Sequence, residues 1–276
     1  MKTATATGKI ILSGEYAVVF GYPGIAMPAP LKVMATFEED SSLNDIEVQR
    51  DTEGGAQWAE YIQDIINPCI ALGSIAPGTL TLANELPLSK GMGSSTAFVV
   101  AITKCLLGEK RRAEARLIED SLNPGHSGID FDVIWDETPI LYRKENESES
   151  INLPANILKG AHLIDTGEPD QQTPELVAWV SERKDEVSDA LKQISDCTER
   201  LQSGEDLMGV IRDHNEAQVM LGVVPEEVQE LNKFFVQQGG AAKVIGAGSR
   251  TGGGGMVLAL GIDAEQVPSE YSVITL

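Results

Sequence analysis

The spacing of hydrophobic and polar positions changes several times in the first half of the chain. Apolar and β-branched runs predict five strands, at 4–12, 15–20, 32–39, 45–49 and 78–84. Ser13 and Gly14 separate the first two strands by a tight turn, and 32–39 and 45–49 are predicted to form a hairpin. Apolar residues at helical spacing predict helices over 56–72, 94–107 and 110–122.

The second half begins with residues 123–130, which are too rich in turn-forming residues to predict a helix. Strands are predicted at 131–135, 139–143 and 159–165, with a polar surface loop at 145–150. A long amphipathic pattern predicts a helix over 173–202, with Thr173 as its N-cap and Pro174 at its first position. Two helices, 204–221 and 225–238, and then strands at 242–246, 255–261 and 271–276 complete the chain.

This order of elements predicts two lobes, of which the first is mixed α/β. The boundary is expected near residues 150–170, and the last strands are expected to complete a sheet in the second lobe. A chain of 276 residues with 42% hydrophobic and 23% charged residues is typical of a globular protein of one large or two closely packed domains.

The chain is strongly acidic, with 42 acidic residues against 21 basic ones and a net charge of −21. This charge argues against binding to nucleic acid or to an anionic membrane surface, because both are negatively charged. An anionic substrate would therefore need a local cluster of basic residues. The excess of acidic residues is otherwise expected to serve solubility.

The cysteines and the apolar runs indicate the cellular compartment in which the protein is expected. Cys69, Cys105 and Cys197 are far apart and form no C-x-x-C pair, so neither a zinc site nor a disulfide framework is indicated. The first residues lack the apolar core of a signal peptide, and no run approaches the ~18 apolar residues of a membrane span. We therefore expect a cytoplasmic protein.

A glycine- and serine-rich loop precedes the helix predicted at 94–107. Residues 87–107 read PLSKGMGSSTAFVVAITKCLL. The first N–H groups of a helix lack internal partners and carry partial positive charge, and glycines allow a phosphate to approach the backbone. Lys90 adds a cation, and Ser94 and Ser95 add hydroxyls. The segment lacks the Gly-Lys-Ser/Thr of a Walker A loop, and an ordinary serine cap on a core helix is the alternative.

Three other segments carry residues suited to the same chemistry. Lys9 lies on an apolar strand, where a lysine is costly to bury without a partner, unless it lies on an edge. Ser127-Gly128-Ile129-Asp130 ends in a carboxylate that either has a chemical role or caps a turn. Near the end of the chain, KVIGAG at 243–248 is followed by four glycines at 252–255.

Taken together, these segments resemble the motifs of the GHMP kinases, a superfamily of small-molecule kinases. GKIILSGEYAVVFG resembles the first family motif, PLSKGMGSST the phosphate loop and KVIGAG the C-terminal glycine motif, in the family order. The chain most resembles the mevalonate kinase branch, in which an acidic residue lies eleven positions before the catalytic aspartate, as Glu119 lies before Asp130. The stretch HLIDTGEPDQQTPELVAWV also resembles that branch.

The resemblance implies an α/β (α+β) two-lobed GHMP kinase fold. Residues 1–155 would form the N-terminal, ribosomal-protein-like lobe, with the phosphate loop at 87–97 and the aspartate motif at 127–130. Residues 156–276 would form the C-terminal α+β lobe, with the glycine motif at 243–255.

The resemblance also implies roles for individual residues in an ATP- and Mg²⁺-dependent kinase. Asp130 and Lys9 would be catalytic, and Ser95 and Glu119 would bind Mg²⁺. The ATP phosphates would bind Lys90, Gly91, Met92, Gly93, Ser94, Ser95 and Thr96. The acceptor would contact Glu15, Tyr16, Thr173, Gly246, Ala247 and Gly248.

The implied activity is phosphorylation of the primary hydroxyl of mevalonate. The alternatives are a phosphomevalonate kinase and a catalytically silent relative that binds a metabolite. Tyr16 stands where mevalonate kinases usually have His, and His126 stands where Pro is usual. Ser249-Arg250-Thr251 lengthen the glycine motif and add a cation. A small-molecule substrate is the implied partner, with neither nucleic acid nor a membrane, and a homodimer is left open.

Overall fold

Long strands open the chain in the computed structural model, which describes residues 1–51 and 55–276. These residues form two compact units built from interleaved segments. Unit 1 comprises residues 1–9, 28–88 and 93–137, and unit 2 comprises residues 10–27, 89–92 and 138–276. The division into domains at residue 155 stays a prediction.

The strands of unit 1 are not joined as a hairpin. They are the first parts of β1 (Lys2–Ser13), most of β2 (Gly24–Glu39), β3 (Ile46–Arg50) and β4 (Gly78–Asn84). β4 pairs antiparallel with β2, so that Phe37 faces Leu80, and β3 pairs in parallel with β4. The predicted hairpin of 32–39 and 45–49 is therefore wrong. A helix crosses over between β3 and β4, and such a crossover is what a parallel pair requires.

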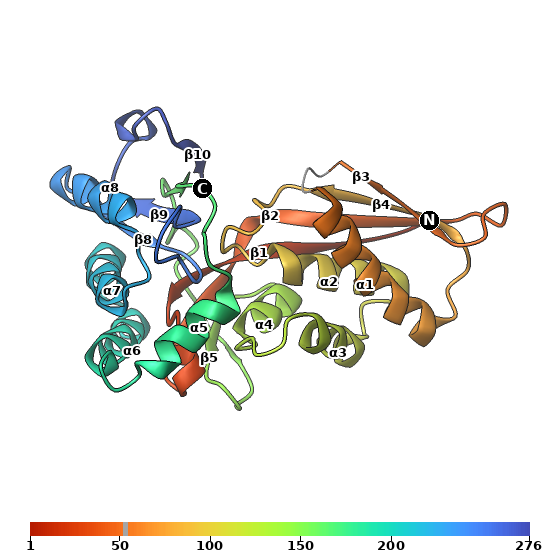
Figure 1. The fold of residues 1–276 in the computed structure, drawn as a ribbon, viewed down its shortest axis with the longest axis horizontal. Coiled ribbons are helices and arrows are strands. Elements are labelled where there is room, and N and C mark those ends of the chain that lie inside the picture. The colour runs from red at the N-terminus through yellow and green to blue at the C-terminus, as the bar shows by residue number, and fades with distance from the viewer. Residues whose placement is uncertain (52–54) are drawn as a thin grey trace. The chain divides into compact units, whose positions relative to one another are not determined.

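The helices of unit 1 lie on one side of these strands (Figure 1). They are α1 (Gly55–Gly73), α2 (Ser94–Leu107), α3 (Arg112–Leu122) and α4 (Ile129–Asp136). α2 is buried along most of its length and packs against the other three helices, which explains its apolar sequence without polar spacing. The helices predicted at 56–72, 94–107 and 110–122 are confirmed.

Two segments predicted as strands are helical. Residues 131–135 lie in α4, which follows Gly128 at φ 97° and has Asp130 and Asp132 in its first turn. Acidic residues stabilise a helix N-terminus, and this helix also buries Phe131, Val133 and Ile134, which overrides the β-branched and aromatic content of the segment. Most of the strand predicted at 15–20 forms a 3-10 helix, η1 (Ala17–Phe20), in which Ala17 joins a hydrophobic cluster and Val18 is buried as well.

Unit 2 contains a four-stranded sheet in the order β10-β7-β9-β8. Its strands are β7 (His162–Asp165), β8 (Ala241–Val244), β9 (Met256–Leu260) and β10 (Ser272–Thr275), and every pairing is antiparallel. The last strands thus complete a sheet in the second half, as predicted. Elsewhere in unit 2, β5 (Ile140–Tyr142) pairs with the first residues of β2 and with β6 (Glu149–Ser150).

The helices of unit 2 follow one another along the chain. They are α5 (Thr173–Glu182), α6 (Ser188–Gln202), α7 (Leu207–Leu221) and α8 (Glu226–Gln237), followed by the 3-10 helix η2 (Ala264–Gln266). The single helix predicted over 173–202 is two helices, interrupted in the charged segment 183–187. The N-cap of α5 is Gln172, which forms a capping box with Glu175, and Thr173 is the first helical residue.

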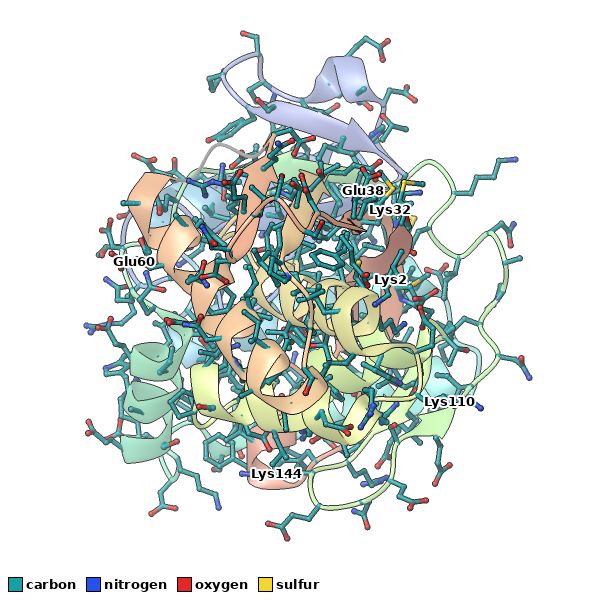
Figure 2. All side chains as sticks on the ribbon, turned by 90° about the vertical axis from the view of Figure 1, so that its right-hand side faces the viewer. Lys2, Lys32, Glu38, Glu60, Lys110 and Lys144 are labelled. Carbon is teal, nitrogen blue, oxygen red and sulfur yellow. The ribbon has the colours of Figure 1, made fainter. Side chains whose placement is uncertain are left out.

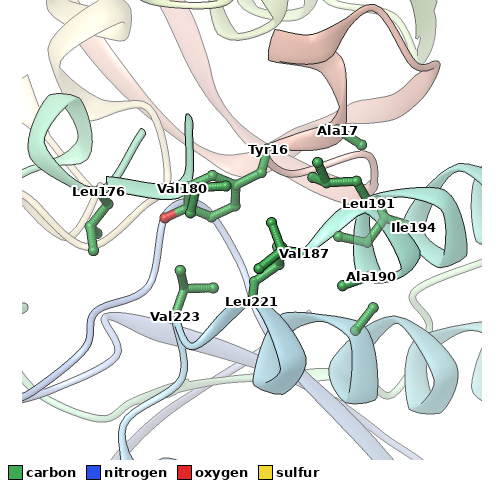
Figure 3. Close-up of a cluster of buried hydrophobic side chains, with 11 residues drawn as sticks. Tyr16, Ala17, Leu176, Val180, Val187, Ala190, Leu191, Ile194, Leu221 and Val223 are labelled. Atoms are coloured by element: carbon green, nitrogen blue, oxygen red, sulfur yellow. The ribbon is translucent and has the colours of Figure 1, made fainter. Parts of the chain in front are cut away.

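One hydrophobic core of unit 2 joins residues from distant parts of the sequence (Figure 3). The ring of Tyr16 packs in this cluster with apolar side chains of α5, α6 and α7. This core fixes the segment that contains the first predicted motif against the helices of the second half of the chain. A second cluster lies between α8 and the four-stranded sheet, around Phe235, Val244 and Val257.

Charged side chains point outward from the surface of unit 1, as Figure 2 shows for Glu60 and Lys110. Among the described residues, no helix has both the length and the apolar character needed to cross a membrane.

Candidate active site

Lys9 and Asp130 form an ion pair in unit 1. Lys9 lies on β1 with its side chain 3% exposed, and its Nζ is 3.2 Å from Oδ1 of Asp130. Asp130 lies in the first turn of α4 and keeps about a third of its side chain exposed (33%). Lys9 is therefore a buried, paired lysine and not a surface one. Its carboxylate partner remains open to a ligand.

The N-terminus of α2 lies beside the stem of Lys9. Gly93 is the N-cap of α2 and has φ 73°, a conformation that favours glycine. A β-carbon at Gly93 would lie 3.0 Å from Cγ of Lys9 and 3.0 Å from Cδ1 of Ile134. The absence of a side chain at Gly93 is thus what lets Lys9 pass the start of the helix.

Glu119 is a buried carboxylate on α3 with one oxygen in use. Thr96 donates its hydroxyl to Oε1 of Glu119 at 2.8 Å, whereas Oε2 is buried without a hydrogen-bond partner. Burial raises the pKa of Glu119, and the hydrogen bond from Thr96 opposes this shift while the charge of Asp130 adds to it. A cation near Oε2 would remove the cost of keeping this carboxylate ionised.

Tyr61 is a residue of this region that the sequence did not indicate. Its hydroxyl accepts a hydrogen bond from Nδ2 of Asn123 at 2.9 Å and is also bonded to Ser95. Burial raises the pKa of Tyr61, and the charge of Glu119 raises it further. Tyr61 thus lies close to both Ser95 and Glu119. It belongs to no motif, and its only signal was its place on the amphipathic helix α1.

The residues that could bind a metal ion are few. Within residues 1–51 and 55–276, no three or more His, Cys, Asp or Glu side chains cluster in a way that could hold a metal ion. The two predicted metal ligands, Ser95 and Glu119, are one hydroxyl and one carboxylate. Such a set fits an ion that takes few protein oxygens, as Mg²⁺ does.

In unit 2, the first half of the glycine-serine loop packs against the C-terminal glycine motif. A β-carbon at Gly91 would lie 2.3 Å from the carbonyl oxygen of Ile245, and one at Gly246 would lie 2.7 Å from Cα of Gly91. The N–H of Met256 donates to the carbonyl of Lys90 at 3.1 Å. Gly91 and Gly246, at φ 84° each, allow two backbone segments to touch.

Lys90 is predicted to contact phosphate, and the structure gives it an acidic partner. Its Nζ donates to Oδ2 of Asp165, and both side chains are about a quarter exposed (25%). Asp165 also accepts the N–H of Gly167 at 3.0 Å. Lys90 therefore starts from an ion pair that a bound phosphate would share or replace.

Glu15 and Tyr16 are held by the C-terminal glycine motif. Glu15 is buried and accepts a hydrogen bond from Nζ of Lys243, and its Oε2 is 3.0 Å from Nε2 of His214. Burial raises the pKa of Glu15, but the charges and hydrogen bonds of Lys243 and His214 lower it from 4.5 to about 2. Tyr16 donates its hydroxyl to the carbonyl of Ala247 at 2.5 Å.

The remaining predicted positions are more exposed. Thr173 is exposed at the start of α5. The guanidinium of Arg250 lies 4.5 Å from the ring centre of Trp179, and its backbone N–H donates to Oε1 of Gln171 at 2.8 Å. In unit 1, Trp58 packs against Tyr61 and Phe98 with ring centres 5.5 Å away.

The predicted residues are divided between the two units. Unit 1 holds Lys9, Gly93, Ser94, Ser95, Thr96, Glu119 and Asp130. Unit 2 holds Glu15, Tyr16, Lys90, Gly91, Met92, Thr173, Gly246, Ala247 and Gly248. The roles of these residues stay predictions.

Comparison with known proteins identifies the class. No family model matches the chain. It is 27% identical over 285 residues to the mevalonate kinase of Methanothermobacter thermautotrophicus, covering 93% of this chain and 89% of that protein. It is 25% identical over 272 residues to the mevalonate kinase of Archaeoglobus fulgidus, covering 93% and 91%.

Solved structures agree with these sequence matches. The mevalonate kinase of Methanococcus jannaschii matches with a TM-score of 0.80 at 20% identity over 99% of this chain and 96% of that one, which shows the fold. The mevalonate kinase of methicillin-resistant Staphylococcus aureus MRSA252 matches with a TM-score of 0.69 at 26% identity over 100% and 98%.

These matches support a GHMP kinase, and the α/β fold implied by the motifs is confirmed. Within that superfamily it is most like the mevalonate kinases, so that it is a mevalonate kinase-like enzyme.

Proposed function

We propose that this protein transfers the γ-phosphoryl group of ATP to the primary hydroxyl of mevalonate, a step of isoprenoid precursor synthesis. The observation that carries the proposal is the buried Lys9 paired with the partly exposed Asp130 beside the N-terminus of α2. The curated relatives that match 93% of the chain are mevalonate kinases, and one matching structure holds R-mevalonate.

The nucleotide phosphates would be bound mainly by backbone groups. The first N–H groups of α2 are unpaired within the helix and carry partial positive charge. Ser94 and Ser95 add hydroxyl donors at the same helix end. Glycine at positions 91 and 93 lets the loop adopt φ values of 84° and 73° and keeps side chains away from a ligand.

Asp130 and Lys9 would act on the reacting atoms. Asp130 accepts the proton of the acceptor hydroxyl, whose oxygen forms the new bond to the γ-phosphorus while the bond to the β-phosphate oxygen breaks and ADP leaves. Lys9, held 3.2 Å from Asp130, stabilises negative charge on the phosphoryl group in flight. The catalytic contribution is therefore positioning and charge stabilisation.

Glu119 and Ser95 would hold Mg²⁺, through Oε2 of Glu119 and the hydroxyl of Ser95. The buried oxygen without a hydrogen-bond partner fits a cation, and Thr96 holds the other oxygen of Glu119. When bound, Mg²⁺ would offset phosphate charge.

A coupled assay of ADP release tests the proposal. Purified protein with ATP and Mg²⁺ is offered mevalonate, phosphomevalonate, homoserine and a panel of sugars. We expect ADP release with mevalonate, at a kcat/KM well above that for every other acceptor. A higher kcat/KM for another acceptor, or no ADP release with any of them while ATP still binds, would contradict it.

Phosphomevalonate is the second candidate acceptor. Tyr16 follows Glu15 as is usual in phosphomevalonate kinases, and Arg250 adds a cation to the glycine motif. In the structure, however, the guanidinium of Arg250 stacks on Trp179 and the Tyr16 hydroxyl is bonded to Ala247. Both features thus have a partner within the protein. A silent, metabolite-binding relative is disfavoured because Asp130 and both loop serines are present.

A further inference from the structure

Two consecutive residues, Glu15 and Tyr16, make separate links to the C-terminal glycine motif. Glu15 binds Lys243, the first residue of that motif, through its carboxylate. Tyr16 binds Ala247, inside the turn of residues 246–248, through its hydroxyl at 2.5 Å. The two links hold both ends of the segment 243–248 against residues 15 and 16.

The link through Glu15 is built from groups that are costly to bury. Glu15, His214 and Lys243 are at most 2% exposed. Apolar residues of similar volume would stabilise a core as well or better, so a buried ionic cluster is poorly explained by stability alone. Lys243 also donates to the carbonyl of Val244 at 3.1 Å, and Gln218 donates to the same oxygen at 2.9 Å. The cluster therefore fixes the backbone just before the turn.

The link through Tyr16 holds a residue in a conformation that tyrosine rarely adopts. Tyr16 has φ 64°, and its ring is 5% exposed in the cluster shown in Figure 3. Such a backbone conformation persists only where the surroundings enforce it. Here the packed ring and the bond to Ala247 do so. The hydroxyl is thereby aimed at the turn.

The turn of residues 246–248 also contacts the predicted phosphate loop. A β-carbon on Gly246 would lie 2.7 Å from Cα of Gly91, and one on Gly91 would lie 2.3 Å from the carbonyl oxygen of Ile245. The backbone of Gly91 is also fixed from the next strand, since Met256 donates to the carbonyl of Lys90. A shift of residues 246–248 would therefore displace Gly91 directly.

We propose that Glu15 and Tyr16 are positioning residues for nucleotide binding, which act through the turn 246–248 on Gly91. This role differs from the acceptor contact that the family resemblance implies for them. The inference rests on the proposed function, because it assigns the phosphates of ATP to the loop that contains Gly91. Both links lie within unit 2.

Replacing Tyr16 with Phe separates the two roles. Tyr16→Phe keeps the ring in its hydrophobic cluster and removes only the hydroxyl that bonds Ala247. We expect the KM for ATP to rise about fivefold, the equivalent of one lost hydrogen bond, with the KM for mevalonate changed by less than about twofold. Tyr22→Phe is the matched control, since Tyr22 packs against the same cluster, and it should leave both constants unchanged.

A rise in the KM for mevalonate with an unchanged KM for ATP would overturn the inference in favour of acceptor contact. Unchanged values of both constants would overturn it as well. Calorimetric titration with a non-hydrolysable ATP analogue keeps the test independent of the acceptor. If the wild type turns over no mevalonate, the proposed function fails, but the inference can still be tested with the analogue. A higher Kd for the analogue in Tyr16→Phe than in Tyr22→Phe supports the inference, and an equal Kd overturns it.

Discussion

Lys9 and Lys243 are both buried lysines, and their neighbours give them different tasks. Lys9 faces Asp130, a carboxylate that keeps a third of its side chain exposed and can meet a ligand. Lys243 faces Glu15, which is buried and also borders His214. A charge pair with one exposed partner can act on a substrate, whereas an enclosed pair can act only on the surrounding backbone.

Replacing Asp130 with Asn removes the proton acceptor while keeping the shape of the side chain. We expect kcat to fall by about 10²–10⁴, because general-base catalysis contributes about that factor, with little change in the affinity for ATP. Steady-state ADP release and calorimetric ATP binding are the measurements. Asp136→Asn is the control, because Asp136 lies on the same helix and pairs with Arg112. The kcat of this variant should stay close to the wild-type kcat. Full turnover by Asp130→Asn would show that the mechanism is wrong.

Replacing Lys243 with Met should destabilise the protein in a way that depends on pH. At pH 7 the variant leaves Glu15 charged and buried, which costs about 3–5 kcal/mol. In the wild type, Glu15 has its pKa lowered to about 2, so its contribution to stability is present above pH 4.5 and lost as the pH falls toward 2. Without Lys243, burial raises the pKa of Glu15, and His214, whose pKa is lowered by burial and by Lys243, takes up a proton more easily.

Both responses add protons to the folded variant, so the loss of stability caused by Lys243→Met should shrink as the pH falls from 7 to 4. Urea unfolding of the variant and the wild type across this range measures it. The double variant Glu15→Gln with Lys243→Met removes the unpaired charge and should regain part of the lost stability at pH 7. A loss that is equal at pH 7 and pH 4 would argue against the buried ion pair.

At the scale of elements, local propensity fails where tertiary contacts decide. The segment 131–135 has the composition of a strand, but Gly128 and the acidic first turn start a helix there, and Phe131 and Ile134 are buried by it. The order of strands is another example, because sequence proximity suggested a hairpin of β2 and β3 while α1 carries the chain across to a parallel partner.

The contact between Gly91 and the turn 246–248 predicts an uneven response to alanine. Gly91→Ala would place its β-carbon 2.3 Å from the carbonyl of Ile245, at a φ of 84° that alanine tolerates poorly. Gly204 has nearly the same φ, 83°, with nothing within 4 Å of a β-carbon. Both variants lose about 1–2 kcal/mol through the backbone, and Gly91→Ala loses a further ~1–3 kcal/mol through overpacking.

Denaturant unfolding and ATP binding distinguish the two alanine variants. Gly91→Ala should also weaken ATP binding, because Gly91 borders the predicted phosphate site, whereas Gly204→Ala should bind ATP as the wild type does. Equal losses of stability in the two variants would mean that the close approach of Gly91 to Ile245 does not constrain the protein.

For the molecule as a whole, the sequence predicted the class of protein better than the contacts between residues that are distant in the sequence. Motif order indicated a GHMP kinase, and the helices with clear periodicity were found close to their expected bounds. The resemblance implied that Lys9 and Asp130 are both catalytic, and the structure places Nζ of Lys9 3.2 Å from Oδ1 of Asp130. The structure also links Tyr61 with Ser95, Lys90 with Asp165 and Tyr16 with Ala247. These partners are 34, 75 and 231 positions apart in the sequence, and no local sequence pattern encodes contacts over such separations.

The interleaving of the two units has a consequence for how such proteins diverge. Each unit consists of three separate stretches of chain, and the polypeptide passes from one unit to the other five times. Genetic exchange at a single point cannot transplant either unit whole, so a crossover would separate Glu15 from Lys243 wherever it fell between codons 15 and 243. Chimaeras made for engineering would therefore need to take both residues from one parent.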